Sequence, residues 1–157
     1  MTYVFDSNSI TGLSFYFPNR FPTFWRLFEA EVETEQVISV REVYKELENH
    51  AYMQQWLGDW LKQHKTNFRV PTSDEMLFVG ELFKVTPFQA LVGEKQRLRG
   101  GPVADPFLIA CAKICGGTVI TQESRKDGAA RIPNVCEHFN VPCSNLEGFL
   151  AEKDWKF

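Results

Sequence analysis

Short β-rich runs alternate with longer stretches that carry apolar residues at helical spacing. This alternation predicts a parallel sheet whose strands are joined by right-handed helical crossovers. We therefore expect an α/β fold of three layers, with a central parallel sheet of short strands flanked by helices. The expected strands cover residues 2–5, 36–38, 67–70, 118–121 and 141–143.

Cap patterns predict where several helices begin. A serine or threonine followed three residues later by glutamate forms a capping box, which predicts helix starts at Ser39, Thr72 and Ser144. Pro106 suits a first helical position, so Asp105 is expected to be the N-cap of the most apolar helix, which ends at Gly116–Gly117. The other expected helices are 10–17, 21–32, a stretch around 56–61, 88–98 and 132–139.

Length and composition limit the class of protein. A chain of 157 residues fits one domain, which we expect to span residues 1–157. The apolar runs are far shorter than the roughly 20 residues needed to cross a bilayer. The start lacks a basic segment followed by an apolar core, so we expect a cytoplasmic protein without a membrane partner. The net charge of −3 excludes an overall basic coat and permits a local basic rim between residues 95 and 131.

The cysteines and histidines do not form a zinc pattern. The four cysteines contain no C-x-x-C pair, and the three histidines are scattered. We therefore expect buried, reduced thiols at Cys111, Cys115, Cys136 and Cys143.

Acidic residues follow two expected strands. Asp6 ends the first strand and Glu123 follows the fourth, so both are expected at the same edge of a parallel sheet, where α/β proteins bind ligands. Asp105 begins a helix beside that edge. Each acid alone has an ordinary explanation: Asp6 as a turn residue, Asp105 as an N-cap, and Glu123 as a partner of Arg125 or Lys126.

The helix expected to start at Ser39 contains two glutamates. Glu42 points away from the apolar stripe at about 100° per residue, and the capping box already gives it a role. Glu46 lies about 60° from Val43, at the border of the stripe, where its side chain can lean into a cleft. Glu46 is therefore the preferred site residue, although a solvent-exposed charge is the ordinary alternative.

Four acids at one sheet edge would repel each other unless a cation lay between them. Carboxylate oxygens are hard ligands that suit Mg²⁺ or Mn²⁺. Such a metal can activate water and stabilise a leaving oxygen during phosphodiester cleavage. The sequence thus predicts a metal-dependent hydrolase site formed by Asp6, Glu46, Asp105 and Glu123.

Four motifs occur in the order expected of a PIN (PilT N-terminal-like) domain, and the chain resembles that family over nearly its whole length. They are Phe5-Asp6-Ser7-Asn8, Val40-x-x-Val43-x-x-Glu46-Leu47, Ala104-Asp105-Pro106-x-x-Ile109-Ala110-x-Ala112 and Val119-Ile120-Thr121-x-Glu123. PIN domains are small α/β nucleases with a parallel sheet and an acidic Mg²⁺ or Mn²⁺ site. Many are ribonuclease toxins of bacterial toxin–antitoxin pairs.

The resemblance assigns roles by position. It implies that Asp6, Glu46 and Asp105 are the three core acids and that Ser7, Asn8 and Thr121 support them. Many family members carry Asp at the fourth acidic place, so Glu123 either ligates the metal directly or acts through water. The ring-rich segment 15–28 is expected to include core positions and, by the same resemblance, to contact an antitoxin or a second protomer.

We therefore expect an endoribonuclease that cleaves single-stranded RNA, the toxin of a toxin–antitoxin pair. Its RNA backbone is expected to contact Arg97, Arg99, Arg125 and Lys126. Three alternatives remain open: a nuclease for structured DNA, an inactive PIN-like binding protein, and a small-molecule phosphohydrolase. The last is disfavoured because Asp6-Ser7-Asn8 lacks the second Asp of a D-x-D motif.

Overall fold

Five parallel strands form the centre of the molecule, as the sequence predicts. The computed structural model describes residues 1–50, 54–91 and 103–157. The strand order is β3-β2-β1-β4-β5, and every neighbouring pair is parallel. The strands are β1 (Tyr3–Phe5), β2 (Val37–Val40), β3 (Phe68–Arg69), β4 (Thr118–Ile120) and β5 (Cys143–Ser144).

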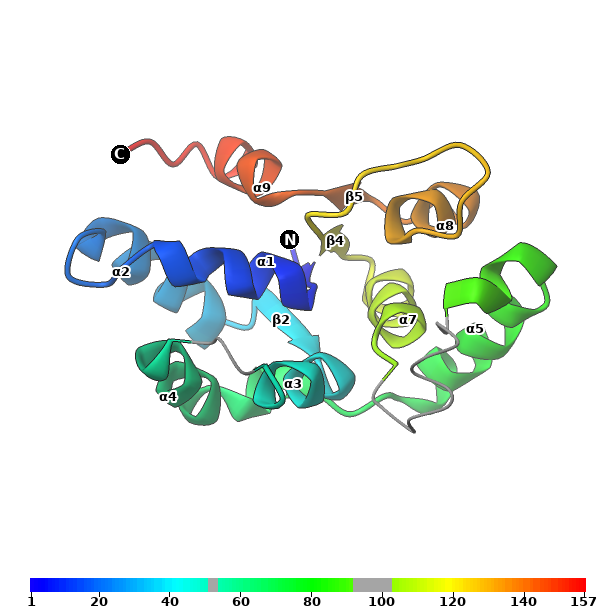
Figure 1. The fold of residues 1–157 in the computed structure, drawn as a ribbon, viewed down its shortest axis with the longest axis horizontal. Helices are drawn as coiled ribbons and strands as arrows, with labels where there is room; N and C mark the ends of the chain where they lie inside the picture. The colour runs from blue at the N-terminus through cyan, green and yellow to red at the C-terminus, as the bar shows by residue number, and fades with distance from the viewer. Residues whose placement is uncertain (51–53, 92–102) are drawn as a thin grey trace.

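Helices cover both faces of this sheet, which gives the expected three layers (Figure 1). One side carries α2 (Pro22–Glu33), α4 (Gln55–Gln63) and α9 (Leu146–Glu152). The other side carries α5 (Ser73–Phe83), α7 (Asp105–Cys115) and α8 (Ile132–His138). Two helices follow β1 and β2 directly and pack against each other: α1 (Ser7–Gly12) and α3 (Arg41–Glu48). Three short 3-10 helices complete the described chain: η1 (Leu13–Phe15), η2 (Lys65–Asn67) and η3 (Thr86–Leu91).

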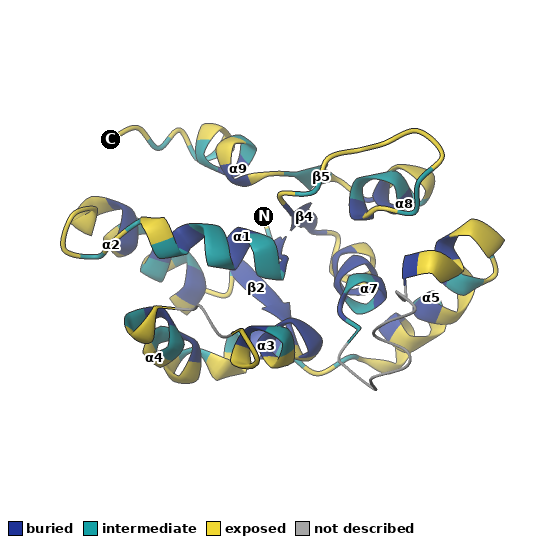
Figure 2. Cartoon of the chain, in the orientation of Figure 1, coloured by how far each residue is buried: buried dark blue, intermediate teal, exposed yellow. Residues whose placement is uncertain are grey.

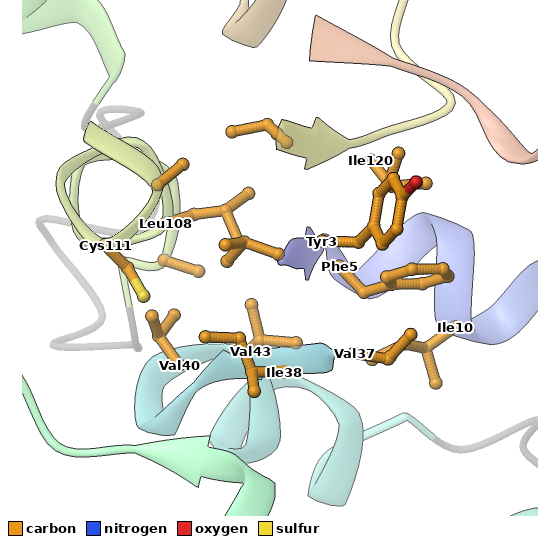
Figure 3. Packing of buried hydrophobic residues seen from close by; sticks show 14 of the residues in the cluster. Tyr3, Phe5, Ile10, Val37, Ile38, Val40, Val43, Leu108, Cys111 and Ile120 are labelled. Carbon is orange, nitrogen blue, oxygen red and sulfur yellow. The ribbon is translucent and has the colours of Figure 1, made fainter. Parts of the chain in front are cut away.

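The central strand β1 is buried on both faces, because a layer of helices packs against each face of the sheet. The rings of Tyr3 and Phe5 point to one side, and Leu108 and Cys111 of α7 lie on the other (Figure 3). The helices show their buried residues toward the sheet and their exposed residues outward (Figure 2).

Aromatic side chains dominate the layer formed by α2, α4 and α9. Phe149 of α9 is fully buried and packs edge-on against Tyr3 at 4.9 Å and Phe5 at 5.3 Å between ring centroids. Edge-to-face contacts at such distances add to the free energy gained from burial. We call the connected rings the aromatic cluster; its members are Tyr3, Phe5, Phe24, Trp25, Phe28, Trp60, Phe149 and Trp155.

The ring-rich segment 15–28 divides between the core and the surface. Phe24, Trp25 and Phe28 face the core, whereas Phe15, Phe17 and Phe21 are exposed. The first three lie on one side of α2, where the helical spacing places them together. The segment therefore supplies core and also presents rings to solvent.

One predicted capping box is confirmed and two are wrong. The Thr72 hydroxyl accepts from the Glu75 backbone, and the Glu75 side chain accepts from the Thr72 backbone, at the start of α5. Ser39 instead lies inside β2, and α3 begins at Arg41. The last helix is capped by Asn145 and not by Ser144, which belongs to β5.

The segment predicted as one helix over 10–17 instead forms α1 and η1, because Asp6 caps a helix directly after β1, and the strand predicted over 141–143 lies at Cys143–Ser144. The expected helix 88–98 lies mostly outside the described residues, and its described part belongs to η3. All four cysteines are unbridged, as expected, but Cys115 is exposed and Cys143 is half-buried. Within residues 1–50, 54–91 and 103–157, no helix is long and apolar enough to cross a membrane.

Candidate metal-binding site

Asp6 sits where β1 meets α1, at the carboxyl end of the central strand. Its side chain is the N-cap of α1 and accepts a hydrogen bond from the Ser7 backbone N–H at 2.7 Å. Its second carboxylate oxygen accepts a hydrogen bond from the Thr121 hydroxyl at 2.8 Å. Asp6 is only 3% exposed, and this burial raises its pKa despite the two hydrogen bonds, which act in the opposite direction.

Small polar side chains around Asp6 hold two strand ends together. The Asn8 side-chain oxygen accepts from the Gln122 backbone N–H at 3.0 Å, and it also receives a longer contact from the Thr121 hydroxyl. These bonds connect the start of α1 with the residues that follow β4. The structure therefore places Ser7, Asn8 and Thr121 beside Asp6.

Glu46 lies in the second turn of α3 and turns toward this edge. Burial raises the pKa of its carboxyl group, and the nearby charge of Asp6 raises it further. Hydrogen bonds from the Ser7 hydroxyl and the Ala104 backbone oppose that shift. Ser7 thus contacts both acids, because its hydroxyl also approaches Asp6 at 3.5 Å.

The prediction that Glu42 caps its helix and points away from the apolar side is wrong, although Glu46 remains the residue that reaches the other acids. Glu42 makes no capping bond, since α3 lacks a side-chain N-cap. It is buried, and one of its oxygens accepts from the Arg41 guanidinium at 2.9 Å. Its other oxygen has no partner in the described part of the chain. The helical wheel gives only the direction of Glu42 relative to the apolar stripe, whereas its burial depends on the elements packed against α3, which include β2, β3 and α1.

Asp105 is not an N-cap. It is the first residue of α7, Ala104 occupies the cap position, and no side chain caps this helix. Its carboxyl group is instead held among the other acids. Burial raises the pKa of Asp105 to about 8, and Asp6, Glu123 and Glu46 each add to the shift.

Glu123 follows β4 and takes an unexpected partner. Its carboxylate accepts a hydrogen bond at 3.0 Å from the backbone N–H of Ile132, the first residue of α8. Negative charge is favourable at the start of a helix. Glu123 therefore provides an acceptor for a backbone N–H group at the start of α8. It forms no ion pair with Arg125 or Lys126. Its charge nevertheless acts on Asp6 and Asp105.

We call Asp6, Glu46, Asp105 and Glu123 the acidic cluster. Neighbouring members of the cluster raise the pKa of Asp6, Glu46 and Asp105, which indicates that the four carboxylates share one region. Among the described residues, none of the four forms an ion pair with Lys, Arg or His. Repulsion between these groups is therefore offset neither by a nearby cationic side chain nor by full exposure to water.

The donor set fits a hard divalent cation in its chemistry: carboxylates supply the oxygens, and their repulsion would be relieved by positive charge. The side chains are not gathered into a finished coordination site. In residues 1–50, 54–91 and 103–157, no three His, Cys, Asp or Glu side chains are arranged so that they could hold a metal ion. Glu123 shows one reason, since its carboxylate is engaged by α8.

Two buried serines that the sequence reading did not select position this edge. The Ser39 hydroxyl donates to the Phe5 carbonyl at 2.6 Å, directly before Asp6. The Ser9 hydroxyl donates to the Ile120 carbonyl at 3.0 Å, directly before Thr121. Serines beside a strand's end could have been flagged, but their partners are more than thirty residues away in sequence.

Two of the four basic residues expected to contact RNA can be located. Arg97 and Arg99 lie outside the described residues. Arg125 forms ion pairs with Asp127 and Glu137, and Lys126 is exposed. The charge of Arg125 is thus engaged within the protein.

Two hollows flank the acidic cluster. One has a volume of about 510 Å³ and lies along the ends of β4 and β5, with Thr121 and Glu123 in its wall. The other, of about 230 Å³, lies between α1 and α3 and includes Ser7 and Glu46. The acids therefore stand between two concave surfaces.

Sequence comparison assigns the chain to a family. A family model described as "Domain of unknown function (DUF4411)" matches residues 3–157. The chain belongs to this family. No curated protein matches the DUF4411 chain. Among solved structures, it is similar to the crystal structure of PAE2754 from Pyrobaculum aerophilum, with 14% sequence identity and a TM-score of 0.41. That match covers 89% of this chain and 97% of the other.

Proposed function

We propose that this DUF4411 protein is a PIN-like endoribonuclease that uses Mg²⁺ or Mn²⁺ to cleave single-stranded RNA. One observation carries the proposal: four carboxylates lie near one another at the carboxyl edge of a parallel sheet without an ion-pair partner in the described residues, and burial together with neighbouring acids raises the pKa of Asp6, Glu46 and Asp105. Such an arrangement costs folding free energy, and clusters of perturbed acids are typical of functional sites.

Asp6, Glu46 and Asp105 are the residues that would hold the cation, with Glu123 as a fourth acid acting directly or through water. A divalent cation bound there would supply activation of water and stabilisation of charge on the leaving oxygen of a phosphodiester. The protein's own contribution is positioning. The Ser7 backbone and the Thr121 hydroxyl fix the two oxygens of Asp6, and Ser7 connects Asp6 with Glu46.

The hydrogen bond between Glu123 and the Ile132 backbone limits how freely this carboxylate could bind a cation. While its carboxylate accepts from the Ile132 backbone, it is anchored to α8 and contributes charge to the region. A group held in this way suits an indirect role better than a direct one. We therefore place Asp6, Glu46 and Asp105 first in the proposal and Glu123 second.

The decisive test is cleavage of a 5′-labelled single-stranded RNA with Mn²⁺ by wild type and by Asp6→Asn. We expect the variant to lose at least about 100-fold in rate, equivalent to about 2.7 kcal/mol of transition-state stabilisation. The exposed Asp74 on α5 offers a matched control, and Asp74→Asn should cleave at the wild-type rate. Undiminished cleavage by Asp6→Asn in a preparation free of other nucleases would refute the assignment.

Parallel reactions and a binding experiment separate the rival functions. Branched DNA cut in preference to RNA would replace the RNA substrate with structured DNA. Calorimetry with Mn²⁺ should detect binding to wild type and weaker binding to Asp6→Asn. No metal binding, together with tight binding of a helical peptide, would favour an inactive binding protein instead.

The toxin role is the finer part of the proposal and rests on the resemblance. The exposed rings of Phe15, Phe17 and Phe21 form the surface where an antitoxin or a second protomer would bind. A gene for a small DNA-binding protein beside this one, together with growth arrest on expression that the neighbour relieves, would support it. Growth arrest that persists in Asp6→Asn would contradict it.

A further inference from the structure

The hollow of about 510 Å³ beside β4 and β5 has a wall in common with the acidic cluster. Thr121 and Glu123 line it, and the Thr121 hydroxyl also bonds to Asp6. A group bound in this hollow would therefore lie one side chain away from the buried acid.

The walls of the hollow combine two kinds of surface. Pro133 and Val141 contribute apolar surface, whereas Gln122, Ser124 and Asn145 contribute polar side chains. Its volume falls within the roughly 300–1,000 Å³ typical of small-molecule pockets. A nucleobase has apolar faces and a hydrogen-bonding edge, and proteins that recognise single-stranded RNA read such bases after they leave the stack. The hollow matches that chemistry better than it matches an isolated phosphate.

Arg125 at the wall is poorly suited to bind a phosphate. Its Nε donates to Glu137 at 2.5 Å, and its other end pairs with Asp127. One cation between two carboxylates leaves a net negative group, which does not attract the RNA backbone. The same two bonds restrict the guanidinium plane, and its side chain is still 51% exposed. A planar guanidinium that is fixed and accessible can stack on a base.

We propose that this hollow binds the base of a nucleotide adjacent to the phosphodiester that is cleaved, with Arg125 as a planar stacking surface. The inference rests on the proposed nuclease function, and it changes the role of Arg125 from a backbone contact to a base contact. A base held here makes the protein sensitive to the identity of that base, through the polar groups of the wall.

The binding test uses the four nucleoside 5′-monophosphates, with ribose 5-phosphate as the probe that lacks a base. Each is titrated into the full chain in the presence of Mg²⁺, and backbone amide signals are followed by NMR. We expect at least one nucleotide to shift the amides of 122–126 and 143–145 and to bind at least about tenfold more tightly than ribose 5-phosphate. Equal binding of all five probes, or shifts confined to other regions, would overturn the proposal.

Two variants localise the effect. Ser124 is exposed and lines the hollow, so Ser124→Trp should fill it and weaken nucleotide binding at least tenfold. Thr66 is also exposed but lies beside β3 at the opposite edge of the sheet, so Thr66→Trp should leave binding unchanged. Arg125→Lys keeps the charge and removes the plane, so it should weaken binding several-fold. Wild-type affinity in Ser124→Trp would overturn the proposal.

Cleavage assays distinguish the proposed base-binding hollow from the proposed nuclease function. If RNA is cleaved, Ser124→Trp should raise KM and flatten the preference among homopolymeric RNAs while Thr66→Trp does neither. Cleavage that Ser124→Trp leaves unaltered would overturn the base pocket and retain the nuclease. Base-dependent binding without any metal-dependent cleavage would retain the pocket and overturn the nuclease.

Discussion

The aromatic cluster and the acidic cluster are both built on β1, yet they differ in what their burial achieves. Tyr3 and Phe5 point into a layer of rings, where each contact removes apolar surface from water. Asp6, the next residue, is just as buried, but burial of its carboxylate raises its pKa and the charge of Glu123 adds to that shift. One residue along the strand therefore separates a stabilising environment from a costly one.

This contrast separates a region that stabilises the fold from a region that costs stability. The rings contribute free energy of folding, and the acids consume some of it. A cluster of repelling carboxylates would not persist for stability alone, since apolar or paired residues could fill the same space. The difference predicts that removal of a ring lowers the free energy of unfolding and that removal of an acid raises it at pH 8, and a third experiment tests the hydroxyl that supports the acids.

The largest change in the free energy of unfolding is expected from removal of an aromatic ring. Phe149 is fully buried and contacts Tyr3, Phe5, Phe28 and Trp155. Phe149→Ala should lower the free energy of unfolding by about 3–5 kcal/mol, measured by urea denaturation. Phe15 is 73% exposed, so Phe15→Ala should change it by less than about 0.5 kcal/mol. Equal effects of the two substitutions would contradict the assignment of stability to the aromatic cluster.

Substitution of Asp105 by Asn is expected to change the free energy of unfolding in the opposite direction, because its carboxyl group makes stability depend on pH. Its pKa of about 8 in the folded protein exceeds its ordinary value, so the metal-free native state holds this proton more tightly than the unfolded chain does. Stability is therefore fully present below the ordinary value and falls as pH rises toward about 8. Between pH 5 and pH 8, metal-free wild type should lose about 2–4 kcal/mol.

Asp105→Asn removes that titration and relieves its neighbours. Urea denaturation with a chelator should show a flatter pH dependence for the variant, and higher stability than wild type at pH 8. Mg²⁺ should stabilise wild type at pH 8 and affect the variant less. A wild-type pH dependence in Asp105→Asn would show that the acids do not share one electrostatic region.

The smallest effect concerns the hydroxyl beneath the acidic cluster. Ser39→Ala removes the bond to the Phe5 carbonyl and should cost about 1–2 kcal/mol. Thr72→Ala removes a helix cap on α5 and should cost about 1 kcal/mol. Of these two residues, Ser39 supports the strand end that carries Asp6 and Thr72 does not. Ser39→Ala should therefore also weaken Mn²⁺ binding, whereas Thr72→Ala should not. Equal metal affinity in both variants would limit Ser39 to a structural role.

Local chemistry determines much of the fold. The alternation of strands and helices, the capping box at Thr72 and the helix end at Gly116 depend on residues near each other in sequence. Asp6 was also identifiable, because a carboxylate that ends a central strand can cap the next helix without distant partners. These features follow from propensities and hydrogen bonds that span a few residues.

Tertiary structure decided the features that depend on distant partners. The S-x-x-E pattern at Ser39 resembles that at Thr72, yet Ser39 lies in β2, where it pairs with Phe68 of β3 and its hydroxyl donates to the Phe5 carbonyl. Asp105 was expected to cap a helix and instead lies among three other acids. Glu123 reaches α8, and Glu42 is buried rather than solvent-facing. Sequence spacing fixes which face of an element a residue occupies, but only the packed fold decides what covers that face.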